Sequence, residues 1–116
     1  GGADELTPSG SNRISHLKDG VVRTYEFDAR ELGIAPCTIE DLRAGDPAQS
    51  AEMMRELLSG KRNDAIRDAT LLNAAATLAT ESGDFNSAFA EVSAALADGR
   101  ALIKMNALVE ATQVFS

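Results

Sequence analysis

The dipeptide Asp19-Gly20 constrains the fold of this chain most, because it separates two segments that read as β-strands. Asp-Gly readily takes the positive φ angles of a tight hairpin turn, so residues 12–17 and 21–27 are predicted to pair as antiparallel strands. One face of the second strand is apolar except for Arg23, and it carries Val21, Tyr25 and Phe27. An isolated hairpin is marginally stable in water, so this one is expected to extend a sheet or to pack on helices.

From residue 38 onward the chain is predicted to be helical. Capping residues, Pro47 and a series of glycines divide it into five helices, at about 38–44, 47–60, 63–82, 84–98 and 100–113. The predicted N-terminal capping residues are Thr38, Asp46, Asn63 and Asp84. The third helix is rich in alanine, and small side chains allow close approach of neighbours. We therefore expect this helix to lie at the centre.

These elements predict an α+β fold with one β-hairpin, with or without a short extra strand, and a cluster of about five α-helices. The expected organisation is a loop over 1–11, the hairpin over 12–27 and a helical cluster over 38–116. The 116 residues are enough for one small domain with one core. The chain does not begin with Met, so we expect a processed or truncated product.

Composition excludes several classes of function. The net charge is −7, which argues against binding to nucleic-acid phosphates, because such binding needs clustered Lys and Arg. No apolar run approaches the roughly 18 residues that span a membrane, so no membrane association is expected. Cys37 is the only cysteine, which leaves no internal disulfide and fits a reducing, cytoplasmic location.

Asp4 and Glu5 are the candidate metal ligands. Two adjacent carboxylates offer the oxygen atoms that Mg²⁺ prefers, and Mg²⁺ often shares such ligands with a substrate phosphate. No catalytic residue is predicted, and His16, the only histidine, is interpreted as a strand residue rather than a general base. Asn73 opposes helix propensity in the middle of the third helix, which favours a side-chain hydrogen bond to a neighbouring loop.

The order of short motifs along the chain resembles the C-terminal third of the anthranilate phosphoribosyltransferase family. The motifs are Ala3-Asp4-Glu5-Leu6, Asp19-Gly20, Glu31-Leu32-Gly33-Ile34, Ile39–Pro47, Leu57-Leu58-Ser59-Gly60, Arg67–Ala75 and Asp98-Gly99-Arg100-Ala101. The resemblance covers essentially the whole chain. It implies a piece of a larger α/β phosphoribosyltransferase domain, which the hairpin would join or flank.

The resemblance also implies a function. In this family an acidic pair helps to hold Mg²⁺ bound with phosphoribosyl pyrophosphate, and Asp4 and Glu5 occupy the matching positions. The implied reaction transfers phosphoribosyl to anthranilate in tryptophan biosynthesis, so the partners of the complete enzyme are small-molecule substrates. The family's glycine-rich pyrophosphate loop and its anthranilate contacts belong to an upstream region, and this sequence has no such loop. The isolated chain is therefore expected to be inactive.

Two alternatives stay open. A pyrimidine nucleoside phosphorylase shares the broad architecture, although phosphorolysis does not need Mg²⁺ on a pyrophosphate. A non-catalytic helical interaction module would leave Asp4 and Glu5 exposed and disordered, and the chain would be a stable monomer. The first hypothesis instead expects apolar surface to be left open, so that the chain self-associates.

Overall fold

The hairpin forms as predicted. The protein is described over residues 3–115 by a computed structural model, and Gly1, Gly2 and Ser116 at the ends of the predicted loop and helical cluster lie outside the described residues. Strands β1 (Ser11–Lys18) and β2 (Val21–Asp28) pair antiparallel, and within residues 3–115 they form a two-stranded sheet. Both turn residues have positive φ, 51° at Asp19 and 76° at Gly20, which confirms the turn prediction.

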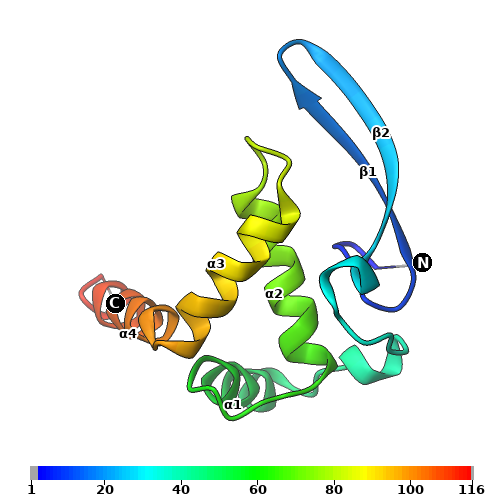
Figure 1. The fold of residues 1–116 in the computed structure, drawn as a ribbon. Helices are drawn as coiled ribbons and strands as arrows, with labels where there is room; N and C mark the ends of the chain where they lie inside the picture. Colours follow the sequence, from blue (N-terminus) through cyan, green and yellow to red (C-terminus); the bar gives the residue numbers. More distant parts are fainter. Residues whose placement is uncertain (1–2, 116) are drawn as a thin grey trace.

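The register decides which hairpin side chains share a face, because directly opposed residues of an antiparallel pair point to the same side. One face carries the pairs Asn12–Phe27, Ile14–Tyr25 and His16–Arg23. Asn12 and Phe27 are buried, so this face is the one that meets the rest of the protein. Arg23 lies on the same face as Phe27 but near the turn, where it is exposed. In Figure 1 the hairpin and the turn between α2 and α3 project to the same side.

Four α-helices follow within the described residues, where five helices were predicted: α1 (Pro47–Leu58), α2 (Ala65–Leu78), α3 (Phe85–Ala97) and α4 (Arg100–Gln113). The predicted first helix is only a 3-10 turn, η2 (Glu40–Leu42), because Arg43 takes an extended backbone. A second 3-10 turn, η1 (Ala29–Leu32), follows β2. In the part of the chain that the structure describes, no helix combines the length and apolar character needed to cross a membrane.

The helix starts test the capping predictions. Asp46 and Gln49 form a reciprocal capping box: the Gln49 N–H donates to Asp46 at 2.9 Å, and the Asp46 N–H donates to Gln49 at 2.8 Å. Asp84 caps α3 as predicted. The prediction that Asn63 caps this helix is wrong. The capping residue of α2 is Asp64, whose carboxylate accepts from the Arg67 N–H at 3.1 Å. A carboxylate suits this end of a helix better because the helix dipole is positive there.

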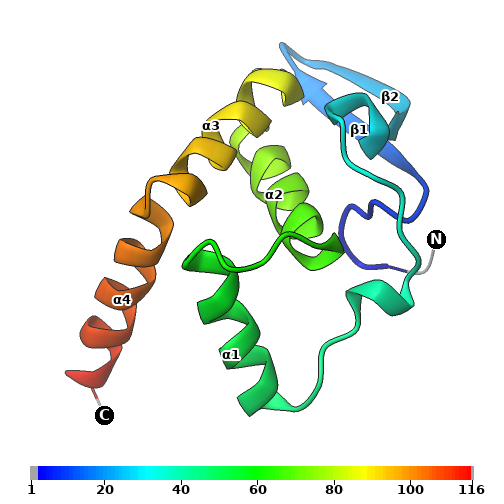
Figure 2. The same cartoon turned by 60° about the horizontal axis from the view of Figure 1, so that its bottom comes forward.

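Helix α2 lies at the centre, as its alanine content predicts. It contributes to each of three buried clusters: Leu72 packs with Phe27, Ala29 and Ile34, Leu71 packs with Leu57 and Leu96, and Ala75 and Ala79 pack with Ala88. The rings of Phe27 and Phe85 stack with centroids 4.6 Å apart, which joins the base of the hairpin to α3. Figure 2 shows α2 crossing between α3 and the N-terminal segment.

Helix α4 is the least covered helix, and none of its residues is buried. It packs on the end of α3 and near α1 through half-buried residues, among them Leu102 and Met105 of its predicted apolar stripe. The other apolar members of that stripe, Leu108 and Val109, are exposed, as is Ile103 at 69%. The helix therefore presents apolar side chains to solvent.

Candidate functional site

The acidic pair lies in the loop that precedes β1, and both Asp4 and Glu5 are exposed. The loop borders a pocket of about 480 Å³, a volume typical of small-molecule sites. The start of β1 and one side chain of α2 complete the wall, which is lined by Asp4, Glu5, Thr7, Asn12, Arg13 and Asn73. The pocket thus brings one residue of α2 to the loop and strand near the start of the described chain.

Asn73 of α2 holds the residue next to the acidic pair. Its Oδ1 accepts a hydrogen bond from the Leu6 N–H at 3.0 Å, and its Nδ2 donates to the Leu6 carbonyl at 2.8 Å. Nδ2 also donates to the Ala69 carbonyl one helical turn earlier, at 2.9 Å. Both amide hydrogens are therefore used, and the prediction that Asn73 positions a neighbouring loop is confirmed.

A second asparagine holds the following residue in the same way. Oδ1 of Asn12 accepts from the Thr7 N–H at 2.8 Å, and its Nδ2 donates to the Thr7 carbonyl at 2.9 Å. Nδ2 also lies 3.3 Å from the Phe27 carbonyl, across the hairpin. Asn12 and Thr7 are both buried, so these bonds satisfy polar groups that water cannot reach. Two consecutive backbone residues are thus fixed by side-chain amides just after Glu5.

The charges of the pocket suit a cation bound together with an anion. Asp4 and Glu5 supply carboxylate oxygens, and Arg13 of β1 supplies a guanidinium group. Within residues 3–115, no three His, Cys, Asp or Glu side chains gather closely enough to form a metal site by themselves. This donor set still fits Mg²⁺, which commonly uses one or two carboxylates and completes its shell with water and substrate phosphate.

The other singled-out residues do not join this pocket. His16 lies farther along β1, where its Nε2 is 2.7 Å from the Thr80 carbonyl. A carbonyl can only accept, so this ring nitrogen carries the proton. Cys37 is half-buried, and burial raises the pKa of its thiol, which keeps it protonated and unreactive.

Sequence reasoning missed Asn12 and Arg13. The signal for Asn12 was available, because it occupies a core-facing position of β1 opposite Phe27. A buried amide there must find partners. Arg13 had no comparable signal, since an arginine on a strand is most often a solvated surface residue.

Comparison with known proteins places the chain in a family. Residues 1–102 match the family described as "Glycosyl transferase family, a/b domain". The chain belongs to this glycosyl transferase family. Among curated members, the anthranilate phosphoribosyltransferase of Agrobacterium fabrum (strain C58 / ATCC 33970) is 39% identical over 110 residues. That match covers 93% of this chain and 32% of the relative.

Solved structures of the glycosyl transferase family confirm the fold. Anthranilate phosphoribosyltransferase from Saccharomyces cerevisiae in complex with 4-fluoroanthranilate gives a TM-score of 0.88 at 21% identity, covering 97% of this chain and 34% of that protein. The same yeast enzyme in complex with PRPP and Mg gives 0.81 at 22% identity, covering 90% and 31%. The resemblance predicted from the sequence is therefore confirmed. The chain spans about a third of the length of these relatives.

Proposed function

We propose that this chain supplies one wall of the active site of an anthranilate phosphoribosyltransferase, which transfers phosphoribosyl from phosphoribosyl pyrophosphate to anthranilate. The observation that carries the proposal is the acidic pair beside a pocket, held in place by Asn73 and Asn12. The 39% identity to the Agrobacterium enzyme over 93% of this chain supports it.

Asp4 and Glu5 are the residues that would hold Mg²⁺. The ion would supply neutralisation of the charge that develops on the departing pyrophosphate. By holding it, the two carboxylates would act on the leaving group rather than on the amine of anthranilate. Their hold on the ion depends on the backbone of Leu6 and Thr7, which the two asparagine amides fix in position.

Arg13 is proposed to contact a phosphate oxygen. Its guanidinium group lines the same pocket as the carboxylates, and within the described residues it forms no ion pair with an acid. A guanidinium group can donate two parallel hydrogen bonds to one phosphate. The pocket would then offer carboxylates to the ion and a guanidinium group to the charged substrate.

Alone, the chain is proposed to be inactive. The reaction requires both substrates to be positioned, and two carboxylates with one arginine do not supply that positioning. The sequence has no glycine-rich loop that could hold the pyrophosphate with backbone N–H groups. The exposure of Asp4 and Glu5 agrees with the interaction-module alternative. The hydrogen bonds that anchor Leu6 and Thr7 favour a preorganised binding site instead.

The test is a chimera in which this chain replaces the aligned segment of the Agrobacterium fabrum relative. We expect phosphoribosyl transfer to anthranilate by the chimera and none by the chain alone. In the chimera, the double change Asp4→Asn/Glu5→Gln is expected to raise the Mg²⁺ concentration for half-maximal rate about tenfold or more, because both proposed ligands lose their charge.

The matched control is Glu91→Gln/Glu110→Gln, which removes the same charge from exposed positions of α3 and α4. It should leave the Mg²⁺ dependence unchanged. An unchanged Mg²⁺ dependence in the Asp4/Glu5 variant would show that the metal assignment is wrong. Mg²⁺-independent phosphorolysis of a pyrimidine nucleoside by the chimera would instead favour the phosphorylase alternative.

A further inference from the structure

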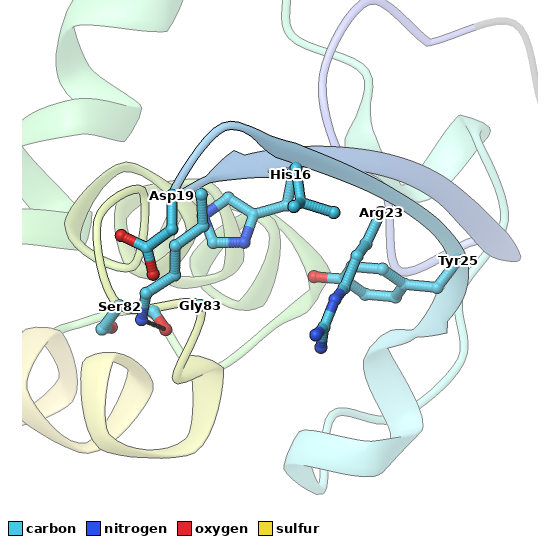
Figure 3. Close-up of a pocket in the computed structure, with 8 residues that line it drawn as sticks. His16, Asp19, Arg23, Tyr25, Ser82 and Gly83 are labelled. Atoms are coloured by element: carbon cyan, nitrogen blue, oxygen red, sulfur yellow. Dashed lines mark hydrogen bonds between the residues drawn. The ribbon is translucent and has the colours of Figure 1, made fainter.

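A second pocket, of about 530 Å³, lies between the turn end of the hairpin and the turn that joins α2 to α3. Its polar lining includes His16, Lys18, Arg23 and Tyr25 from the hairpin and Ser82 from the opposite turn. In Figure 3, Arg23 and Tyr25 are drawn toward one end of the pocket and Asp19 toward the other, and His16 is drawn in the middle. The hairpin wall is thus basic where Arg23 lies, and the one acid is set apart from it.

Arg23 differs from the arginines outside the hairpin, each of which has a nitrogen within 3.7 Å of a carboxylate oxygen. Those arginines are Arg30, Arg43, Arg55, Arg62, Arg67 and Arg100. Over residues 3–115, the Arg23 side chain has no ion pair and no hydrogen bond, although acids outnumber bases in a chain of net charge −7. It is exposed, on the hairpin face that also carries Tyr25. Its guanidinium group is therefore available to a ligand.

The walls of this pocket are tied together before any ligand arrives. His16 donates from Nε2 to the Thr80 carbonyl at 2.7 Å, and the ammonium group of Lys18 donates to the Ser82 carbonyl at 3.4 Å. These bonds fix the end of the hairpin to the α2–α3 turn. Lys18 still has two N–H donors, and the Tyr25 hydroxyl forms no hydrogen bond in the part of the chain that the structure describes.

We propose that this pocket binds the phosphate group of a small molecule. The guanidinium group of Arg23 can donate two parallel hydrogen bonds to phosphate oxygens, and the hydroxyl of Tyr25, which lines the same pocket, can donate a third. Lys18 adds positive charge from the turn end of the pocket. A preformed wall lowers the entropy lost on binding. This inference does not involve Asp4, Glu5 or Mg²⁺, and it stands apart from the proposed transferase function.

The sequence offers two probes for the test. His16 is the only histidine and Tyr25 the only tyrosine, and there is no tryptophan, so each signal is assigned to one residue of the pocket. The 116-residue chain is titrated with inorganic phosphate, without metal, while the imidazole NMR signals and the tyrosine fluorescence are recorded. We expect both signals to shift and to saturate. Sodium chloride at matched ionic strength should produce no saturating change.

The decisive variant is Arg23→Gln, which should weaken phosphate binding about tenfold or more because it removes the charge-assisted donors. Arg43→Gln, an exposed arginine paired with Glu40, is the matched control and should bind as the unmodified chain does. The His16 signal before titration tells whether the pocket is intact in each variant. Shifts that do not saturate, that chloride reproduces, or that survive in Arg23→Gln would overturn the proposal.

Discussion

The side-chain amide of Asn73 makes a reciprocal pair of hydrogen bonds with the backbone of Leu6, 67 residues earlier in the sequence. The Asn73 side chain thereby pairs with both backbone polar groups of Leu6, as a neighbouring β-strand would. Because Leu6 follows directly on Glu5, the central helix sets the position of the acidic pair. The site and the core of the protein are thus connected through one amide.

Replacing Asn73 is expected to loosen this connection. Asn73→Ala should lower the free energy of unfolding by about 1–3 kcal/mol, because it leaves the partly buried Leu6 N–H and carbonyl without their protein partners. Urea denaturation measures the change. The matched control is Asn106→Ala on the exposed side of α4, expected to change stability by less than about 0.5 kcal/mol. Equal effects of the two changes would contradict the role given to Asn73.

The capping box of α1 gives a second prediction. Asp46→Ala should destabilise the protein by about 1 kcal/mol, since the Gln49 N–H loses its acceptor. Asp46→Asn keeps an oxygen at the same position and should cost much less. Thermal unfolding followed by circular dichroism separates the two variants. If both variants unfold at the same temperature, the hydrogen bond to Gln49 does not contribute.

The pairing of Asp28 with Arg30 predicts an acid-sensitive contribution to stability. Hydrogen bonds from the Arg30 side chain and backbone lower the pKa of Asp28 to about 2 from its ordinary value of 3.8. The folded pKa lies below the unfolded one, so the contribution is complete above about pH 4 and disappears as the pH falls toward 2. NMR titration of the Asp28 carboxyl should therefore give a midpoint near 2.

The variant Arg30→Gln checks this assignment of cause. Without the guanidinium group, the pKa of Asp28 is expected to return toward its ordinary value, although the backbone N–H of residue 30 still donates to it. Arg43→Gln, which breaks the pair with Glu40, should leave the Asp28 titration unchanged. A midpoint near 3.8 in the unmodified protein would rule out the pairing in solution.

Exposed apolar side chains predict self-association of the isolated chain. Leu17 and Val22 form an opposed pair on the outer face of the hairpin, and Ile103 and Leu108 are exposed on α4. Burying such surface is favourable, and exposed apolar patches commonly mark contacts between proteins. Light scattering should show an average mass that rises with protein concentration. A constant monomer mass across the concentration series would favour the interaction-module alternative instead.

Local signals predicted the elements of the fold, and their limits explain the errors. Asp19-Gly20, Asp46 and Asp84 act through neighbours only a few residues away, so the sequence reveals what they do. The short helix at Thr38 is different. Its capping bonds to Asp41 form, with the Thr38 N–H donating at 2.8 Å, yet the helix stops after one 3-10 turn. A cap favours the start of a helix but does not extend it.

The candidate site was only partly predictable for the same reason. Asp4 and Glu5 stand out as a pair, and Asn73 stands out because its type opposes its place in a helix. Neither observation says that the pocket also takes Asn12 and Arg13 from β1, because that depends on how the hairpin packs against α2. In the sequence, Arg23 stands out as the charged residue among the apolar residues of its strand face. Its lack of an acidic partner is visible only in the three-dimensional structure.

The hydrogen bonds of the two asparagine side chains also predict the order in which parts of the chain dock during folding. The amides of Leu6 and Thr7 donate to side chains that belong to α2 and β1, so they are protected from solvent only after those elements have come together. Contacts across 67 residues form late in folding, because the intervening chain must first be ordered. The acidic segment should therefore be the last part to dock when the chain folds. In native-state hydrogen exchange, the amide hydrogens of Leu6 and Thr7 should exchange early, well before those at the centre of α2.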